Sequence, residues 1–289
     1  SDPKISFDAN GNCNHCSNAI ERLKKFYIPD ERGKEALQKL IIKMKKAGEG
    51  KPYDCIIGLS GGVDSSYLAF KTKDWGLRPL IFHVDGGWNT KESEANVKHL
   101  AEYLGYDLEV YTVNRDEMRD LQIAFFKASL ANLDVPQDHL FFAVLFKYAE
   151  KNGIKYWLSG SNLVTESILP VSWGYTALDS KQLLAIHKQF GTRPLKEFPT
   201  LSFWDYCKFY GNIPFAQSVE ALKPLNLINY EPSKAKKEMQ EAFGWRNYGR
   251  KHDESIFTRL FQNYILPTKF GYEKRRAHLA SLIISAVIT

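Results

Sequence analysis

The chain has 289 residues, of which 44% are hydrophobic and 25% are charged, and its formal net charge is +6. Four cysteines are too few for a disulfide scaffold, no apolar run is long enough to span a bilayer, and no secretory signal opens the chain. We therefore predict a cytoplasmic globular protein whose modest positive charge suits small phosphorylated ligands.

The predicted elements begin after a polar, turn-rich segment over residues 1–30. A basic amphipathic helix follows over 31–47, because apolar residues recur there at three- and four-residue spacing. Beyond a glycine-containing linker, strands are predicted over 53–59, 78–84, 108–113 and 155–158, and helices over 65–75, 91–104, 116–130 and 140–151. This alternation indicates right-handed βαβ units and a parallel α/β sheet of the Rossmann-like type.

From about residue 163 the alternation stops, and the remainder is predicted to consist of loops and helices. The predicted organisation is a Cys-containing knuckle and helix over 1–50, a nucleotide-binding domain over 51–162, and a helical substrate-binding region over 163–289. Ligands of parallel sheets bind at the carboxyl ends of the strands. The segments Ser60–Ser66, Asp85–Asn89 and Ser159–Asn162 should therefore line one crevice.

The segment Ser60-Gly61-Gly62-Val63-Asp64-Ser65-Ser66 joins the first strand to a helix and has the composition of a phosphate-binding loop. Glycines let backbone N–H groups approach phosphate, a helix N-terminus favours an anion, and the three serines add hydroxyl donors. Asp64 could cap the helix or hold Mg²⁺ between phosphates. No Gly-Lys-Ser/Thr sequence is present, so this is not a Walker A loop. The alternative is a plain helix cap in a tight turn.

The Ser-Gly-Gly-x-Asp-Ser pattern resembles the PP-loop of ATP pyrophosphatases, which have the adenine nucleotide alpha hydrolase type of fold. In that family the loop grips the pyrophosphate that leaves ATP, and AMP is passed to the substrate. The resemblance implies ATP and Mg²⁺ as cofactors, with Ser60 and Asp64 taking part in catalysis.

Two further segments fit the same resemblance. In His83-Val84-Asp85 the strand backbone would contact adenine, and the acid would meet ribose or metal; Asp85 could instead be a turn residue or helix cap. In Gly160-Ser161-Asn162 the glycine would allow close approach to AMP, and Glu166 follows shortly after. The alternative for this second segment is a surface turn.

Cys13 and Cys16 have the spacing of one knuckle of a tetrahedral zinc site. One knuckle supplies two ligands where a structural site needs four, and Cys55 and Cys207 are unpaired in the sequence. The chain therefore cannot complete a Zn²⁺ site by itself, whereas a second Cys-x-x-Cys upstream would complete it. A redox pair and plain structural thiols are the alternatives.

Nearly the whole chain is similar to bacterial N-acetyl sugar amidotransferases. The resemblance rests on residues 5–16, the PP-loop, residues 83–89 and 160–162, and two C-terminal stretches over 251–255 and 266–278. It implies that ATP adenylates the N-acetyl carbonyl of a nucleotide-activated acetamido sugar. Ammonia then displaces AMP and gives an acetamidino sugar for surface polysaccharide of the O-antigen type. Family members usually carry an earlier Cys-x-x-Cys, which is absent here.

The ammonia needs a source. Neither Cys55 nor Cys207 lies on the strand-to-helix elbow that a glutaminase nucleophile requires. The resemblance therefore implies a separate glutaminase subunit with a cyclase-like barrel that channels ammonia.

The C-terminal region carries basic residues that could bind the triphosphate or the sugar diphosphate: Lys251, His252, Lys269, Lys274, Arg275 and Arg276. Lys269 is the preferred catalytic and ATP-binding residue, since it follows Leu-Pro-Thr in an apolar context, and Arg276 is the next choice. The alternative is a solvated helix face. Three aromatic residues could stack on a uracil or a sugar, or belong to the core: Trp88, Trp173 and Tyr175.

Two other functions compete with the amidotransferase. The first is a PP-loop enzyme that modifies tRNA by thiolation or lysidine-type ligation, for which Cys207 is the one plausible sulfur carrier. No dedicated RNA-binding domain is recognisable, so a nucleic-acid partner is not expected. The second is a non-enzymatic nucleotide sensor, although sensors on this fold rarely keep the full set of hydroxyls and acid in the loop.

Overall fold

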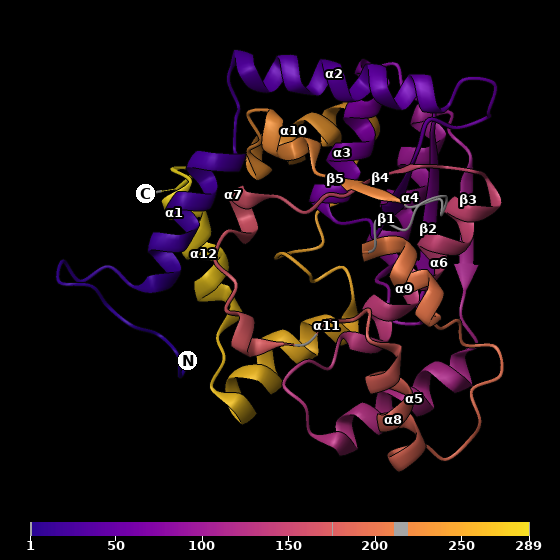
Figure 1. The fold of residues 1–289 in the computed structure, drawn as a ribbon, viewed down its shortest axis with the longest axis vertical. Coiled ribbons are helices and arrows are strands. Elements are labelled where there is room, and N and C mark those ends of the chain that lie inside the picture. Colours follow the sequence, from indigo (N-terminus) through magenta and orange to yellow (C-terminus); the bar gives the residue numbers. More distant parts are fainter. Residues whose placement is uncertain (1, 175, 211–218, 289) are drawn as a thin grey trace.

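The computed structural model describes residues 2–174, 176–210 and 219–288, with only the backbone for 209 and 210. Its centre is a five-stranded parallel sheet in the order β3-β2-β1-β4-β5 (Figure 1). The strands are β1 (Cys55–Leu59), β2 (Pro79–Asp85), β3 (Leu108–Thr112), β4 (Tyr156–Leu158) and β5 (Glu220–Leu222). This order is the doubly wound arrangement, which confirms the predicted Rossmann-like α/β class.

The helices cover both faces of the sheet and form most of the C-terminal region, as predicted. They are α1 (Asn14–Phe26), α2 (Glu31–Ala47), α3 (Val63–Asp74), α4 (Lys91–Leu104), α5 (Arg115–Ala128), α6 (Val135–Lys151), α7 (Leu163–Glu166), α8 (Ser180–Phe190), α9 (Phe203–Tyr210), α10 (Pro232–Phe243), α11 (Ile256–Leu260) and α12 (Lys274–Ile284). Two short 3₁₀ turns, η1 (Val171–Trp173) and η2 (Pro224–Leu227), and a π-helical segment, η3 (Phe261–Phe270), complete the set.

Three elements differ from the predictions. Helix α1 lies within residues 1–30, which were predicted to be polar and turn-rich. The strand β5 lies in the region predicted to hold only loops and helices, and it pairs in parallel with β4. It has three residues, too few to show a period of two in the sequence. Helix α6 begins at Val135 rather than at 140, because Pro136 stands in its first turn, where the missing N–H of proline costs nothing.

Alternate residues of β1 enter two separate cores. Ile57 belongs to a cluster with residues of α2, α3, α4 and α10, whereas the preceding Ile56 packs with residues of α5, α6, α8 and η3. Both side chains are fully buried. A strand buried on both faces reads as a continuous apolar run, which is why it is recognisable in the sequence.

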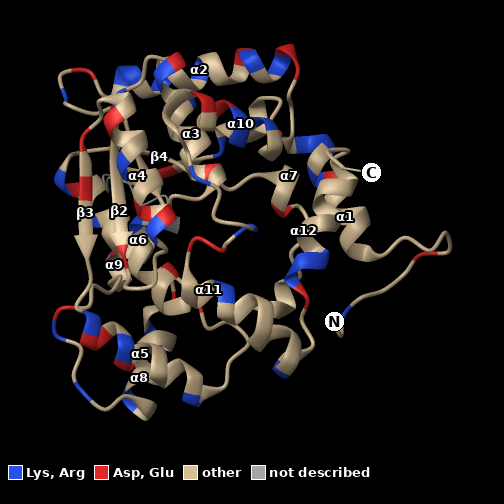
Figure 2. Cartoon of the chain, turned by 180° about the vertical axis from the view of Figure 1, so that it is seen from behind, with Lys and Arg blue, Asp and Glu red and all other residues tan. Residues whose placement is uncertain are grey.

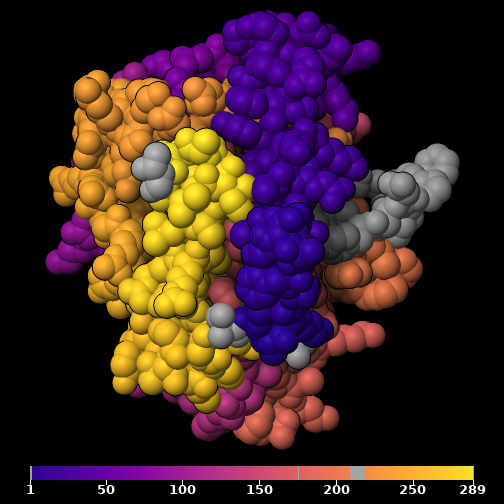
Figure 3. Space-filling view, turned by 90° about the vertical axis from the view of Figure 1, so that its left-hand side faces the viewer, coloured from indigo at the N-terminus to yellow at the C-terminus, as the bar shows by residue number. Residues whose placement is uncertain are grey.

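The two ends of the chain pack against each other. Ala19 of α1 and Ala277 of α12 are buried in one cluster, and Figure 3 shows the indigo N-terminal part alongside the yellow C-terminal helix. Helix α12 also packs against α7, which follows β4. This docking brings C-terminal residues to the carboxyl ends of the strands.

Lys and Arg residues are interspersed with Asp and Glu residues along α2 and α10 (Figure 2), so these helices are mixed in charge rather than uniformly basic. Among the helices that the structure describes, none is both long enough and apolar enough to cross a membrane.

Candidate active site

The predicted phosphate loop lies between β1 and α3 at the carboxyl end of the sheet. Gly61 has a φ of +77°, and a Cβ at this position would lie 2.2 Å from the backbone oxygen of Ser93. Only glycine meets both conditions, because L side chains avoid positive φ and the neighbouring backbone leaves no room. Gly62 is the N-cap of α3 and has no side chain to cap it, so Asp64 does not cap the helix; the Gly62 N–H donates instead to Ser60 Oγ at 3.2 Å.

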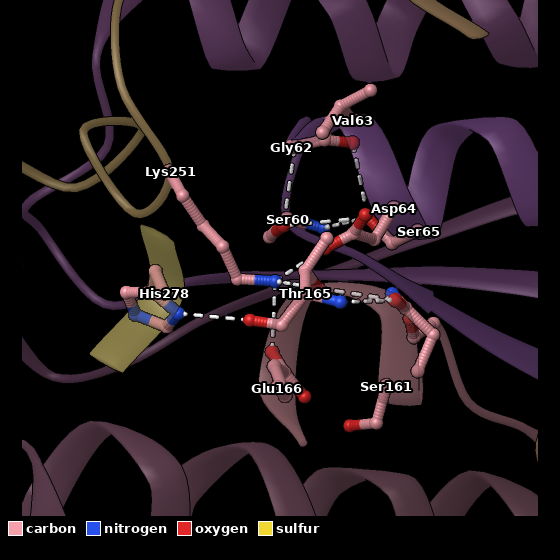
Figure 4. Close-up of polar contacts among 12 residues, drawn as sticks. Ser60, Gly62, Val63, Asp64, Ser65, Ser161, Thr165, Glu166, Lys251 and His278 are labelled. Carbon is pink, nitrogen blue, oxygen red and sulfur yellow. Dashed lines mark hydrogen bonds and ion pairs between the residues drawn. The ribbon is translucent and has the colours of Figure 1, made fainter. Parts of the chain in front are cut away.

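Asp64 instead lies in a charged cluster with Lys251 and Glu166 (Figure 4). The Lys251 ammonium donates to Asp64 Oδ2 at 2.6 Å and to Thr165 Oγ1 at 2.8 Å, and it lies 2.9 Å from Glu166 Oε1. The hydroxyl of Tyr230 donates to the other oxygen of Asp64. Three segments distant in sequence therefore meet at one cation.

The charge on Lys251 is stabilised where it lies. Burial by itself would favour the neutral amine, but the carboxylates of Asp64 and Glu166 outweigh this effect and raise the pKa of Lys251. The side chain of Lys251 is only 18% exposed. The site thus holds a nearly buried, permanently charged ammonium beside the loop.

A segment that we call the strap, residues 245–255, carries Lys251 across the loop. Its backbone is fastened to α4 and the residues before it: Arg246 N–H donates to Asn96 Oδ1 at 2.7 Å, and the Glu254 carbonyl accepts from Thr90 N–H at 2.9 Å. The Tyr248 hydroxyl accepts from the Val63 N–H at 3.0 Å. One of the loop amides predicted to face phosphate is therefore already satisfied by the strap.

Glu254 lies directly over the loop. Ser60 Oγ donates to Glu254 Oε1 at 3.4 Å, and a Cβ on Gly62 would lie 2.8 Å from the same oxygen. Its second oxygen is buried without a hydrogen-bond partner among the described residues. Burial, with the nearby charge of Asp64 adding to it, raises the pKa of Glu254 to about 7. The carboxyl therefore changes its charge near neutral pH.

The serines of the loop divide into two groups. The hydroxyl oxygens of Ser60 and Ser65 lie 3.3 Å apart at the mouth of the loop. Ser66 is fully buried, and its hydroxyl has no partner among the described residues. The structure contradicts the prediction that Ser66 donates to phosphate, because the first turn of α3 directs this side chain into the core.

The predicted site residues at the end of β2 have structural partners. His83 Nδ1 donates to the Leu59 carbonyl at 2.7 Å, and its Nε2 lies 3.0 Å from Asn89 Nδ2. Asp85 pairs with Arg115 at 2.8 Å and accepts from the Gly87 N–H at 2.9 Å. The turn-residue interpretation of Asp85 is therefore supported, while the adenine contact of the His83-Val84 backbone stays a prediction.

The predicted residues after β4 lie beside the loop. Asn162 caps α7 by accepting from the Thr165 N–H at 3.0 Å. A Cβ on Gly160 would lie 2.9 Å from the Ser65 nitrogen, so this glycine lets the segment approach the phosphate loop itself. Ser161 is labelled in the same close-up, and its backbone N–H donates to Ser159 Oγ at 3.3 Å (Figure 4). The structure brings all of them together with Asp64, and their contact with AMP stays a prediction.

The preferred basic residues are not at the loop. Lys269 is exposed, and its ammonium lies 5.5 Å from the ring centre of the adjacent Phe270. Arg276 is exposed on α12. No contact in the described part of the chain joins either residue to the loop, and Lys251, from the same basic set, occupies the position expected of Lys269. Apolar neighbours in the sequence did not identify the lysine at the site, because those neighbours of Lys269 pack within the protein while its ammonium stays exposed.

Of the three aromatic candidates, Trp173 is buried and Trp88 is partly buried against the core. Trp173 stacks on Tyr272 with ring centres 5.2 Å apart, and Trp88 contacts Phe257 at 5.8 Å. Tyr175 lies outside the described residues. The core interpretation therefore holds for both tryptophans.

The cysteine pair is close but incomplete as a metal site. The sulfur atoms of Cys13 and Cys16 lie 3.2 Å apart, and burial raises the pKa of Cys16 to about 11. The neighbouring His15 points to Asp2 at 2.5 Å. Among the described residues no three potential metal ligands gather, so zinc binding stays a prediction that needs ligands from elsewhere.

Three residues of the site were missed by sequence reasoning: Tyr230, Tyr248 and Glu254. The tyrosines lack a local motif, and Glu254 was noted only as part of the stretch 251–255 on which the family resemblance rests. Their positions depend on which segments of the chain pack over the loop, and this packing is decided only by the tertiary fold.

Comparison with solved structures finds distant similarities. The NH3-dependent NAD synthetase from Campylobacter jejuni is 16% identical with a TM-score of 0.37, over 54% of this chain and 72% of that chain. The NMN synthetase from Francisella tularensis is 14% identical with a TM-score of 0.37, over 81% and 94%. The U34-tRNA thiolase NcsA from Methanococcus maripaludis is 16% identical with a TM-score of 0.36, over 86% and 80%. These TM-scores are too low to support a conclusion about function.

Sequence comparison gives one finding, at the C-terminus. Comparison with curated protein sequences finds no match. The family model described as the C-terminal domain of WbpG-like LPS biosynthesis proteins matches residues 254–289. This segment contains Glu254, α11, η3 and α12. The C-terminal segment of the chain is thus similar to the C-terminal domain of WbpG-like LPS biosynthesis proteins.

Proposed function

We propose that this chain is an ATP-dependent enzyme that activates a substrate oxygen as its adenylate and releases pyrophosphate. The observation that carries the proposal is the cluster of Asp64, Lys251 and Glu166 at the mouth of a glycine-containing strand-to-helix loop. A helix N-terminus, hydroxyl donors and an ammonium together suit the phosphates of ATP.

Each group has a role in this proposal. The hydroxyls of Ser60 and Ser65 bind the leaving pyrophosphate, together with loop amides such as that of Val63 once the strap side chains release them. Lys251 neutralises charge that develops as the bond to the α-phosphorus breaks. Asp64 already holds a cation, the Lys251 ammonium, and its carboxylate oxygens are of the kind that Mg²⁺ prefers. Mg²⁺, when bound, would supply charge neutralisation between the phosphate oxygens.

Nucleotide entry requires the side chains of Tyr248 and Glu254 to withdraw from the loop, while Lys251 stays beside Asp64. The Val63 N–H is bonded to Tyr248, and Glu254 covers Gly62. Phosphate oxygens would compete with both side chains for the same space and donors. The arrangement described here is therefore a closed form, and ATP binding exchanges strap contacts for phosphate contacts.

The substrate that we propose is a nucleotide-activated acetamido sugar. Support comes from the sequence resemblance and from the similarity of residues 254–289 to a domain of LPS biosynthesis proteins. The amide oxygen attacks the α-phosphorus, and pyrophosphate leaves with the bonding electrons. Ammonia from a separate glutaminase subunit then adds to the amide carbon, loses a proton, and expels AMP to leave an acetamidino group.

A pyrophosphate-release assay tests the proposal. Acetamido nucleotide sugars are supplied one at a time with ATP, Mg²⁺ and ammonium chloride, and AMP is measured in parallel. We expect pyrophosphate and AMP in equal amounts with at least one of these sugars and none without it. Asp64→Asn keeps the size of the side chain and should abolish the signal. Pyrophosphate release with bulk tRNA but with no sugar would replace the sugar by a nucleic-acid substrate.

A further inference from the structure

His278 presents an unused nitrogen inside the candidate active site. It lies on α12, and its Nδ1 is 3.1 Å from the carbonyl oxygen of Thr165 (Figure 4). A carbonyl oxygen can only accept, so Nδ1 carries the hydrogen. The neutral ring then has a lone pair on Nε2, and this atom is buried with no hydrogen-bond partner among the described residues.

A buried nitrogen with a free lone pair is costly unless a ligand or substrate pairs with it. Its neighbours indicate which ligand. Thr165, whose carbonyl orients the ring, also accepts a hydrogen bond from Lys251 at 2.8 Å through its hydroxyl. Glu166 is the next residue and contacts the same lysine. The ring is therefore fixed by the same residues that hold the cation beside Asp64.

The surroundings keep the imidazole neutral. Burial lowers the pKa of His278, and the charges of Lys251 and Lys274 lower it further, against the opposing effects of the Thr165 carbonyl and Glu166. The ring of His252 on the strap lies 5.4 Å away, and burial with the charge of Lys251 lowers its pKa as well. An uncharged imidazole near neutral pH can accept a proton, which an imidazolium cannot.

We infer that His278 is the general base of the second half-reaction, in which Nε2 takes the proton from a nitrogen nucleophile as it displaces AMP. The inference rests on the proposed function. Ammonia adds to the carbon of the adenylated amide and forms a C–N bond. One proton passes from that nitrogen to Nε2, the C–O bond to AMP breaks, and AMP leaves with the electron pair. The imidazolium returns the proton to solvent.

The two half-reactions differ in whether they need a general base. Attack of the amide oxygen on ATP needs no base at this position, because a neutral amide oxygen is the nucleophile. Transfer to ammonia needs one, because the added nitrogen is cationic until it loses a proton. General bases contribute roughly 10²–10⁴-fold to such a step.

The test uses two variants of the full chain. His278→Asn places an amide N–H where Nδ1 lies and keeps the hydrogen bond to Thr165, but removes the base. His278→Gln places an amide near the Nε2 position instead. His99→Asn makes the same change on α4 and serves as the control. Sugar-dependent exchange of labelled pyrophosphate into ATP reports adenylation without ammonia, and acetamidino-sugar formation reports transfer.

We expect His278→Asn to keep exchange within a few-fold of wild type and to lose transfer by roughly 10²-fold or more. Hydroxylamine, a stronger nucleophile than ammonia, or added imidazole should restore part of the lost transfer. Transfer at the wild-type rate in both variants overturns the inference, and so does loss of exchange and transfer together in both. Absence of exchange in the wild-type protein with every acetamido nucleotide sugar overturns the proposed function itself.

Discussion

The ammonium of Lys251 lies 2.6 Å from a carboxylate oxygen of Asp64, although 187 positions separate the two residues in the chain. Glu166 lies 2.9 Å from the same ammonium. Two carboxylates from different strand ends therefore share one cation supplied by the strap. Without that cation they would repel each other beside the loop that we propose to bind phosphate.

Replacing Lys251 by Met should damage both folding and activity. Removing the cation leaves Asp64 and Glu166 uncompensated, so the free energy of unfolding should fall by about 3–5 kcal/mol. The loss of charge stabilisation should lower kcat/KM for pyrophosphate release by about 10²–10³-fold. Lys269→Met is the matched comparison: its side chain is exposed, and stability should change by less than about 0.5 kcal/mol. A larger activity loss in Lys269→Met would restore the choice made from sequence.

The pKa of Glu254 predicts a specific pH dependence. Burial raises this pKa to about 7, from the ordinary glutamate value of 4.5. The folded state thus binds more protons than the unfolded state between these values, and stability falls as pH rises through this window. Above pH 7 the buried, charged carboxylate lowers the free energy of unfolding by about 1–3 kcal/mol. Urea unfolding of wild type and Glu254→Gln from pH 5 to pH 8 should show the variant gaining relative stability with pH. A constant difference would show that the carboxyl is charged throughout.

Tyr248→Phe tests whether the strap competes with ATP. Loss of the hydroxyl frees the Val63 N–H and should cost about 1 kcal/mol of stability, because a buried donor loses its partner. The same change weakens the closed form, so ATP should bind about fivefold more tightly. Calorimetric titration with ATP and Mg²⁺ measures this. Weaker binding by Tyr248→Phe would mean that the hydroxyl contacts the nucleotide.

Gly61→Ala should be far more harmful than the same change at Gly105. Both glycines have positive φ, at +77° and +67°, so both variants bear the left-handed cost of about 1–2 kcal/mol. Only at Gly61 would the new Cβ also meet a backbone oxygen, at 2.2 Å, whereas nothing lies within 4 Å at Gly105. Thermal unfolding should separate the two variants. Equal losses would show that the loop can shift away from Ser93.

Ser66→Ala separates the buried serine from the loop serines. Its hydroxyl is buried and unpartnered among the described residues, so its removal should leave stability unchanged or raise it by about 1 kcal/mol. Pyrophosphate release should stay near the wild-type rate. Ser60→Ala, which removes a hydroxyl at the mouth of the loop, should lower that rate by about tenfold or more. A Ser66→Ala enzyme as slow as Ser60→Ala would mean that α3 rearranges when ATP binds.

Most of the sheet could be predicted because the central strands β1, β2 and β4 are buried and read as apolar runs. The run over β1 and the helix over residues 91–104 stand out by hydrophobicity and period. The strand β5 could not be predicted from the sequence, because a three-residue strand is defined by its pairing with β4 rather than by its own sequence. Of the candidate site, the phosphate loop and Glu166 were recognisable because their residues are contiguous with strand ends.

The choice among the basic residues could not be made from sequence. Lys251 and Lys269 have the same chemistry and lie in the same C-terminal region, and nothing local distinguishes them. The strap places one over Asp64, while the other lies on the surface of η3. Tyr230 and Tyr248 could not be identified from the sequence either, because only the tertiary fold brings them to the loop.

By itself the sequence determined the parallel α/β sheet and the position of the phosphate loop, because hydrophobic period and glycine placement are local properties of the chain. Only the tertiary structure decided which lysine neutralises Asp64, which serine is buried, and which histidine keeps a free nitrogen at the site. Those assignments depend on contacts between segments more than a hundred positions apart, and burial and charge act through distance in space rather than along the chain.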